Sequence, residues 1–407
     1  MISDVVVIGA GPAGLSAAVA AAEAGAIVVV IDENPRAGGK LLGQLHEEPG
    51  TGWWIGAEIS EKLAERAVKA GVRILTNRQV WNLSPQWEVA LDNGESVSAE
   101  YAVVATGAAE RPLPVPGWSL PGVMAIGAAQ TLTNYYRVRP GDRIAIVGID
   151  PLSLTVAHEL SMAGADVVGI YLPSKSVFAG SQADPDRNLE YLAGMSDLAP
   201  NAFLRWGGRL ASNPDLRNLA LTFFPTSGIP LMGTRLNLRK SLVSIGGNDR
   251  VQHVEVATID KHGNAGKSRT VKVDCVCISG GLYPVQELTR DCALVRIDQL
   301  GGTVPLYSPE METTQDNLFV AGNVAGIEGA KIAMAQGNLA GTVIASRLGL
   351  LQGKQAIDPA AEAVRAARRS SAITFMPDIE EGRRIADDLW LKRDKENSLA
   401  QKDESYA

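Results

Sequence analysis

Cysteine is scarce in this chain. Its 407 residues include three cysteines, Cys275, Cys277 and Cys292, and no Cys-x-x-Cys pair. So few cysteines exclude a disulfide framework, and their scarcity predicts a reducing compartment, the cytoplasm. Cys275 and Cys277 lie two residues apart in the apolar segment 271–278. We therefore expect both side chains on one face of a buried strand, where they pack without reacting.

Positive charge and histidine are also sparse. A net charge of -7 gives the chain no general electrostatic reason to bind nucleic acid, so none is expected as a partner. The four histidines, His46, His158, His253 and His262, are scattered along the chain without the spacing of metal ligands. No metal site is predicted.

A long hydrophobic run occurs once, at residues 5–31, where Glu23 is the one ionisable side chain. Four glycines, a proline and a β-branched ending divide the run into strand, turn, helix and strand, so no transmembrane segment is predicted. The N-terminus has no basic region and no small-residue cleavage site, so a signal peptide is not expected.

A glycine-rich turn joins the strand expected at residues 5–8 to the helix expected at 15–24. Residues 9–14 read Gly-Ala-Gly-Pro-Ala-Gly. Gly9 permits a tight turn, Gly11 lets the backbone approach a pyrophosphate, and Gly14 allows close packing of the helix, whose N-terminus supplies N–H donors and positive potential. The pattern predicts a site for the ADP half of a dinucleotide. The alternative is a glycine-rich turn without a ligand.

Asp32 follows the next expected strand, residues 27–31, at the position that accepts hydrogen bonds from the adenosine ribose. Because a carboxylate there disfavours a 2′-phosphate, the predicted ligand is FAD or an NAD-like dinucleotide and not NADP. Residues 34–40, Asn-Pro-Arg-Ala-Gly-Gly-Lys, either continue this site or form a plain surface loop.

The strand–turn–helix unit has a second copy. With Gly148 aligned to Gly9, the strands at 5–8 and 144–147 coincide, and an Ala-Gly pair ends both helices. The scaffold is therefore repeated.

The second copy has lost the residues that contact a ligand. Asp150 stands where the first copy has Gly11, Ser153 corresponds to Gly14, and Tyr171 corresponds to Asp32. A carboxylate beside a pyrophosphate would cost about 1–4 kcal/mol. We expect this copy not to bind NAD(P)H in the usual way.

Several further blocks resemble one family of flavoproteins. They are residues 105–118 (Ala-Thr-Gly-Ala-Ala-Glu-Arg-Pro-Leu-Pro-Val-Pro-Gly-Trp), 120–123, 127–130, 280–284 with 287–288, and 322–330 (Gly-Asn-Val-Ala-Gly-Ile-Glu-Gly-Ala). Over residues 4 to about 345 the chain resembles the α-subunits of heteromeric amine-oxidising flavoenzymes. That family includes opine, proline and hydroxyproline dehydrogenases, hydrogen cyanide synthase and heterotetrameric sarcosine oxidase.

The resemblance implies a division of labour. A β-subunit, which is a flavoprotein of the amino-acid oxidase type, would abstract hydride from an amino acid or secondary amine, and this chain would supply its own nucleotide site and part of an electron path. In some relatives the first site holds another adenine nucleotide instead of FAD. Many such α-subunits also end in a cysteine-rich [2Fe–2S] domain, whereas no cysteine follows Gln352 here. FMN or an iron–sulfur cluster is therefore expected only at or from partner subunits, such as a small Fe–S subunit.

The expected fold is α/β, with two Rossmann-like dinucleotide-binding domains of the glutathione/thioredoxin-reductase type, the second inserted in the first, and a helical C-terminal tail. The expected segments are 1–110 (FAD-binding domain), 111–280 (degenerate NAD(P)-binding-like domain), 281–350 (return to the first domain) and 351–407 (charged helical tail). Strands are expected at 72–75, 101–105 and 317–321, an antiparallel piece at 79–104, and helices at 58–70 and 330–348.

The resulting hypothesis is the nucleotide-binding α-subunit of a hetero-oligomeric dehydrogenase or oxidase acting on an amino acid or secondary amine. A stand-alone NAD(P)H-dependent flavin oxidoreductase and a non-catalytic scaffold with a structural nucleotide are the alternatives. Trp53 and Trp54 either contact a flavin or partner or pack ordinarily. No residue is assigned a catalytic role. The predicted cofactor-binding residues are Gly9, Gly11, Pro12, Ala13, Gly14, Asp32, Glu33, Asn34, Arg36, Gly39, Lys40, Val80, Ala105, Thr106, Gly107, Arg111, Gly322, Asn323 and Ala330.

Overall fold

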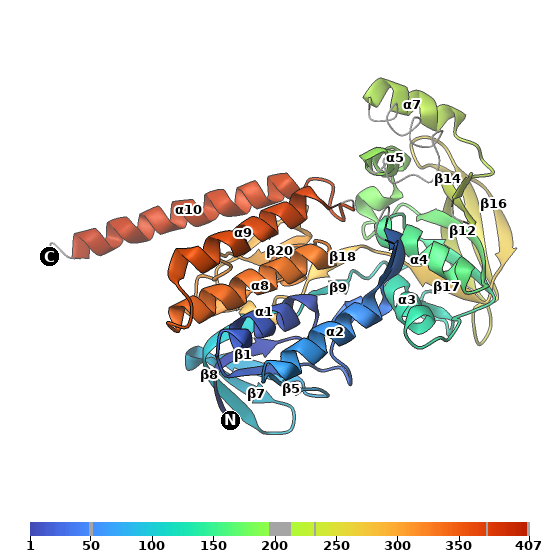
Figure 1. Cartoon of the computed structure of the whole chain (residues 1–407). Coiled ribbons are helices and arrows are strands. Elements are labelled where there is room, and N and C mark those ends of the chain that lie inside the picture. The colour runs from blue at the N-terminus through green and yellow to red at the C-terminus, as the bar shows by residue number, and fades with distance from the viewer. Residues whose placement is uncertain (49–51, 195–212, 232, 372, 405–407) are drawn as a thin grey trace. The chain divides into compact units, whose positions relative to one another are not determined.

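The computed structural model describes residues 1–48, 52–194, 213–231, 233–371 and 373–404 (Figure 1). Its contacts group the chain into two compact units. Unit 1 comprises Met1–Leu41, Gly56–Ala109 and Leu282–Ala407, and unit 2 comprises Leu42–Ile55 and Glu110–Gly281. Residues 42–55, inside the first segment expected from the sequence, thus belong with unit 2. The segment boundaries predicted from the sequence stay a prediction.

Unit 1 is built on a seven-stranded sheet in the order β5-β2-β1-β8-β7-β6, with β21 paired to β8. The strands of this sheet are β1 (Ile2–Ile8), β2 (Val28–Ile31), β5 (Arg73–Leu75), β6 (Val80–Ser84), β7 (Glu88–Leu91), β8 (Ser96–Val104) and β21 (Leu318–Val320). Three further strands of unit 1 lie outside the sheet: β18 (Leu282–Pro284), β19 (Leu294–Ile297) and β20 (Gly302–Pro305). β1 is parallel to β2 and β8, with Ile8 opposite Ile31 and Val104. The carboxyl ends of these three strands therefore lie together, at the edge where open α/β sheets bind ligands.

The antiparallel piece expected at 79–104 is formed by β6, β7 and β8, and β8 also includes most of the strand expected separately at 101–105. In the structure β8 runs unbroken, pairing antiparallel with β7 near Ser98 and parallel with β21 near Ala102. Extended backbone can form different ladders along its length, so the change of partner leaves no break in the strand.

The helices of unit 1 are α1 (Pro12–Glu23), α2 (Gly56–Lys69), α8 (Ala330–Arg347), α9 (Gly353–Arg369) and α10 (Ile379–Glu404). α1, α8 and α9 lie side by side in Figure 1. A Cβ at Gly337 would overlap the carbonyl oxygen of Ala13, and one at Gly341 that of Ala17. Glycine is thus required where α8 crosses the turn-bearing helix.

The C-terminal helices contribute to the core of unit 1. Ala360 and Val364 of α9 join the main hydrophobic cluster. Ile379 and Ala386 of α10 pack with Leu300 and its neighbours in β19 and β20. The tail is helical and charged, as expected, and these four apolar residues are buried in the core of unit 1.

No helix in the described part of the chain combines the length and the apolar character that a membrane crossing needs. The apolar run at residues 5–31 forms β1, α1 and β2, as the sequence predicted.

Unit 2 contains an eight-stranded sheet in the order β10-β17-β11-β12-β14-β15-β16, with β13 paired to β14, and a hairpin of β3 and β4. The strands are β3 (Leu45–Glu48), β4 (Gly52–Ile55), β10 (Val123–Ala125), β11 (Arg143–Val147), β12 (Asp166–Pro173), β13 (Ile229–Leu231), β14 (Thr234–Gly246), β15 (His253–Ile259), β16 (Ala265–Lys272) and β17 (Cys275–Ile278). Its helices are α3 (Ile126–Asn134), α4 (Pro151–Met162), α5 (Pro185–Gly194) and α7 (Pro214–Phe223), and β9 (Ala108–Glu110) spans the unit boundary.

The expected strand at 271–278 is two strands. β16 ends at Lys272 and belongs to an antiparallel hairpin, whereas β17 begins at Cys275 and pairs in parallel with β11. Cys275 and Cys277 nevertheless share one buried face, with their sulfur atoms 4.0 Å apart.

Candidate nucleotide site

The glycine-rich turn of unit 1 has a backbone that only glycine allows at two positions. Gly9 has a φ of +104°, and a Cβ there would overlap the carbonyl oxygen of Ala105 on the neighbouring strand. A Cβ at Gly14 would overlap the carbonyl oxygen of Gly9. These glycines bring the first turn of α1 close to the ends of β1 and β8.

Gly11 differs from these two glycines because the space that a side chain would occupy is empty. No heavy atom lies within 4 Å of a Cβ built there. Gly11 is also the N-cap residue of α1, and no side chain caps the helix. The N–H groups of the first turn are therefore left for another acceptor, which is the arrangement that binds a pyrophosphate.

Asp32 is held beside this turn by backbone donors. Its exposed fraction is 7%. One carboxylate oxygen accepts a hydrogen bond of 2.6 Å from the N–H of Ala10, and the other accepts from the N–H of Asn34 at 2.8 Å and from its side-chain amide at 3.0 Å. A carboxylate oxygen can accept more than one hydrogen bond, so Asp32 keeps acceptor capacity for a ribose hydroxyl.

Other predicted residues lie around the same turn. Gly39 approaches it closely, since a Cβ there would be 3.2 Å from the Cα of Gly11. A Cβ at Gly322 would be 2.9 Å from the Cβ of Ala13. Thr106, which follows β8, donates a hydrogen bond of 2.6 Å from its hydroxyl to the carbonyl of Val285.

Six further predicted residues lie outside residues 9–14 of the turn itself. Glu33, Arg36 and Lys40 are exposed, Val80 begins β6, and Ala330 begins α8. Arg111 is exposed and belongs to unit 2, where its N–H donates to the carbonyl of Gly281 at 2.8 Å. For these residues the cofactor role stays a prediction.

The sequence did not predict a buried network of hydrogen bonds and ion pairs around Gly322, which approaches the turn at Ala13. The N–H of Gly322 donates to the side-chain oxygen of Gln336 at 2.9 Å, and the amide of Gln336 donates to Glu328 at 3.1 Å. Glu328 also forms ion pairs with Arg368 of α9 and Arg383 of α10. The sequence did contain one signal of this network, because Gln336 is a polar residue within the largely apolar helix α8.

Asn323 is tied to the same loop, because its side-chain oxygen accepts a hydrogen bond of 3.0 Å from the N–H of Glu328. A hydrogen bond that this oxygen accepts from a cofactor would have to use its remaining lone pair.

The second turn, in unit 2, repeats the backbone geometry of the first. Gly148 has a φ of +100°, and a Cβ there would overlap the carbonyl oxygen of Ser279. Its N–H donates to the carbonyl of Tyr171 at 2.9 Å, as that of Gly9 donates to Ile31 at 2.7 Å. The two glycines therefore occupy equivalent places.

The helix after the second turn is capped by its own residues. Asp150 accepts a hydrogen bond of 2.7 Å from the N–H of Ser153, whose hydroxyl accepts one of 3.0 Å from the N–H of Asp150. The hydroxyl of Ser279 donates to the other carboxylate oxygen at 2.5 Å. Burial raises the pKa of Asp150, and the hydrogen bonds from Ser279 and Ser153 offset this only in part. The carboxyl of Asp150 thus takes the place that a pyrophosphate would need.

Comparison with known families and curated proteins gives two kinds of match. Residues 3–184 match the pyridine nucleotide-disulphide oxidoreductase family, and residues 302–351 match the family named glucose inhibited division protein A. An opine oxidase subunit of Agrobacterium tumefaciens (strain Ach5) is 29% identical over 353 residues, 83% of this chain and 64% of that subunit. Hydrogen cyanide synthase subunit HcnB of Pseudomonas protegens is 27% identical over 368 residues, 86% of this chain and 72% of the subunit.

The chain is a distant relative of these subunits. The predicted family resemblance is confirmed, and the match to the pyridine nucleotide-disulphide oxidoreductases implies FAD binding. The alpha subunit of sarcosine oxidase from Rhizobium meliloti (strain 1021) is 27% identical over 85% of this chain and 31% of the relative. The chain thus spans less than two thirds of the opine oxidase subunit and about a third of the sarcosine oxidase subunit.

Solved structures show the same fold. L-proline dehydrogenase from P. horikoshii matches with a TM-score of 0.63 and 19% identity, over 90% of this chain and 59% of that one. Thioredoxin reductase from T. acidophilum matches with a TM-score of 0.60 and 20% identity, over 85% and 99%. The predicted fold class is confirmed: this relative of the α-subunits has two Rossmann-like sheets of the thioredoxin-reductase type and C-terminal helices.

A buried carboxyl in unit 2 has no counterpart in the sequence predictions. Glu159 of α4 has an exposed fraction of 2% and accepts hydrogen bonds of 3.2 and 3.1 Å from the side-chain amide of Gln130 on α3. Burial raises the pKa of Glu159 to about 8, and the hydrogen bonds from Asn134, Gln130 and the backbone of Leu45 offset this only in part.

We predict that replacing Asp150 by Ala lowers the free energy of unfolding by about 1–2 kcal/mol, because α4 loses its N-cap. Asp150→Asn keeps the acceptor oxygen and should cost much less. Thermal unfolding of the three proteins measures the difference. Equal stability of the Ala variant and the parent would show that the cap is not needed.

We also predict that Glu159 makes stability fall with rising pH. Its pKa is about 8 in the folded protein against 4.5 ordinarily. Between these values the unfolded chain has lost the proton and the folded chain retains it, so the folded state is progressively disfavoured up to pH 8. Glu159→Gln cannot titrate, and above pH 8 it should be more stable than the parent by about 2–5 kcal/mol.

Urea unfolding from pH 5 to 9 measures this effect, with Glu47→Gln, an exposed carboxyl of the same unit, as the matched control. Parallel pH profiles for the parent and Glu159→Gln would contradict the assignment.

Proposed function

We propose that the chain is the FAD-binding α-subunit of a multi-subunit dehydrogenase or oxidase that oxidises an amino acid or a related secondary amine. Its relatives are named as subunits of opine oxidase, hydrogen cyanide synthase and sarcosine oxidase. The sequence blocks at 105–118 and 322–330 support the same family. In this proposal a partner flavoprotein β-subunit of the amino-acid oxidase type oxidises the substrate, and the present chain contributes electron transfer and assembly.

The observation that carries the proposal is the contrast between the two turns. In unit 1, Gly11 is open on its side and the first turn of α1 has no side-chain cap, so a pyrophosphate fits there. Asp32, fixed by the N–H of Ala10, would hold the ribose. In unit 2, Asp150 and Ser153 fill the equivalent place, and we infer that unit 2 binds no NAD(P).

Bound FAD would supply a two-electron acceptor, and the residues of this chain hold and orient its adenosine end. Gly9, Pro12, Ala13 and Gly14 would shape the turn beside the pyrophosphate, as part of the proposed contact set. That set also contains Glu33, Asn34, Arg36, Gly39, Lys40, Val80, Ala105, Thr106, Gly107, Arg111, Gly322, Asn323 and Ala330. Any FMN or [2Fe–2S] cluster would lie at or come from partner subunits, of which a small Fe–S protein is one.

Dithiol chemistry of the disulfide-reductase kind is not supported. Cys275 and Cys277 are fully buried in β17, and Cys292 is also buried. The hydrogen bond with Cys275 and burial raise the pKa of the Cys277 thiol well above its ordinary value. Buried thiols without a stabilised thiolate do not exchange with a substrate disulfide.

The absorbance spectrum of the purified chain tests the proposal. We expect flavin bands that NADH leaves unchanged and that candidate amines bleach only when a partner flavoprotein subunit is present. Gly11→Val should lose the flavin bands because its side chain enters the pyrophosphate position. Its Tm should match that of cofactor-free parent, since no atom lies within 4 Å of the Cβ position.

Gly194→Val is the matched control, because Gly194 is also free of neighbours at its Cβ position and lies on α5 of unit 2. It should retain the flavin. A colourless parent chain without bound nucleotide would contradict the proposal, and bleaching by NADH alone would favour a self-sufficient flavin reductase.

A further inference from the structure

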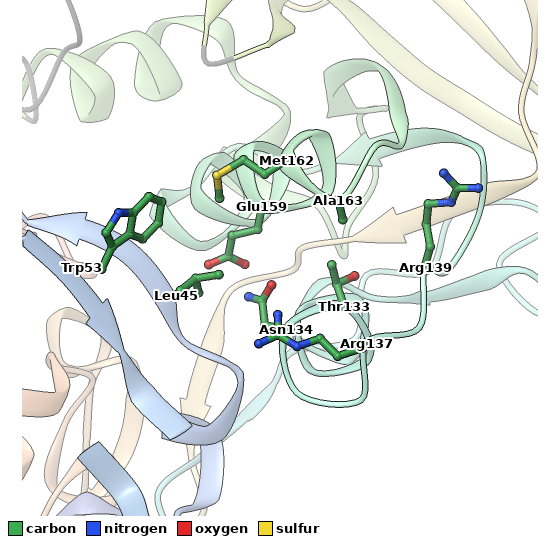
Figure 2. Close-up of a pocket in the computed structure, with 9 residues that line it drawn as sticks. All are labelled: Leu45, Trp53, Thr133, Asn134, Arg137, Arg139, Glu159, Met162 and Ala163. Atoms are coloured by element: carbon green, nitrogen blue, oxygen red, sulfur yellow. The ribbon is translucent and has the colours of Figure 1, made fainter. Parts of the chain in front are cut away.

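Unit 2 contains a cavity of about 500 Å³, lined by α3, α4 and the β3–β4 hairpin (Figure 2). The hairpin is joined to α3 directly, since the side-chain amide of Asn134 donates to the carbonyl of Gly43 at 2.8 Å. A cavity of this volume is in the range of small-molecule sites. All of its lining residues belong to unit 2.

The buried end of the cavity carries the carboxyl of Glu159. Figure 2 shows this carboxyl extending from α4 toward Asn134 and Leu45. Its hydrogen bonds come from neutral groups, and no ion pair joins it to a Lys, Arg or His in the described part of the chain. A buried carboxyl without a cation costs stability, and such groups are concentrated at sites that bind ligands.

Thr133, on α3 beside Asn134, also lines the cavity and has an exposed fraction of 6%. Its hydroxyl oxygen is buried and forms no hydrogen bond within the described structure. A buried hydroxyl without a partner typically costs about 1–3 kcal/mol.

Two arginines, Arg137 and Arg139, also line the cavity. Arg139 forms an ion pair with Asp142 and donates to the carbonyl of Gly164 at 3.2 Å. Arg137 is exposed, and its guanidinium takes part in no ion pair among the described residues. Its φ of +57° lies in the left-handed region, which is costly for a side chain of this size and is found most often at functional positions.

Apolar side chains complete the wall. Leu45 and Trp53 come from the hairpin and Met162 from the end of α4. Trp53 is 52% exposed and Met162 45% exposed. Trp54, by contrast, points elsewhere, since its indole N–H donates to Gln44 at 3.1 Å. Of the two tryptophans singled out by the sequence, Trp53 is thus the one available to a cavity ligand.

We propose that this cavity binds a free α-amino acid with an apolar side chain, with its ammonium group at Glu159 and its carboxylate at Arg137. A cation supplies the partner that Glu159 lacks, and an arginine guanidinium matches the geometry of a carboxylate. Trp53 and Met162 cover the side chain. This site is independent of the nucleotide turn in unit 1 and goes beyond the proposed function.

Titration calorimetry on the full-length chain tests the proposal, with L-leucine and L-proline as probes. We expect saturable binding at a single site. Two matched compounds report on the two ends: isopentylamine lacks the carboxylate, and N-acetyl-L-leucine lacks the ammonium. Each should bind at least about tenfold more weakly than L-leucine, because each leaves one charged group of the cavity without its partner.

Variants locate the site. Glu159→Gln and Arg137→Gln should each weaken L-leucine binding about tenfold or more. Loss of binding in Glu159→Gln cannot come from unfolding, because this variant should be more stable than the parent at pH 8 and above. Thr133→Val, of the same size, should raise Tm, because it removes a buried hydroxyl without a partner. Arg187→Gln, which removes an exposed arginine of α5 outside the cavity, is the control and should bind as the parent does.

Two results would overturn the proposal. One is the absence of saturable binding by any common protein amino acid or its N-methyl derivative. The other is binding that Glu159→Gln and Arg137→Gln leave unchanged. Neither result depends on flavin colour, so the nucleotide site and the amino-acid site are tested separately.

Discussion

The first turn of a helix carries backbone N–H groups that no residue of the same helix can satisfy, and what accepts them decides the role of each unit in this chain. In α1 the N-cap is Gly11, which offers no side chain, so the donors are left for an anion. In α4 the N-cap is Asp150, whose carboxyl accepts from Ser153 and from Ser279. Both copies share one strand–turn–helix scaffold, in which a glycine with positive φ packs on a neighbouring carbonyl oxygen. The helix N-terminus is thus uncapped by side chains in unit 1 and capped in unit 2.

Local patterns in the sequence were sufficient for the parts of the fold that depend on local constraints. The turns at Gly9 and Gly148 need positive φ, and the buried β-branched strands beside them follow from composition. The sequence also predicted that Asp150 stands at a ligand position, but not that it caps α4. Its partner Ser279 lies 129 residues away, and no local pattern reports a contact of that separation. For the same reason the packing of residues 42–55 in unit 2 and the Glu328 ion pairs with α9 and α10 could not be predicted.

Unit 2 has the same strand–turn–helix scaffold, but Asp150 caps its helix, so on the proposed function the unit requires another explanation than nucleotide binding. The polar groups buried between α3 and α4 supply one. Glu159 costs stability at neutral pH and above, and Thr133 has a hydroxyl without a partner among the described residues. Proteins retain such costs where they serve a function. In the proposed arrangement, unit 1 holds a nucleotide and unit 2 holds an amino acid.

The central claim is that one of the two turns holds a dinucleotide and the other is closed by Asp150. The most direct test is to denature the purified chain and to identify and quantify the released nucleotides by mass spectrometry and absorbance. The account predicts a single equivalent of FAD per chain, and no NAD(H) or NADP(H) even after incubation with an excess of either. Release of a nicotinamide dinucleotide in stoichiometric amount would contradict the closure of unit 2, and a chain that releases no FAD would contradict the assignment of unit 1.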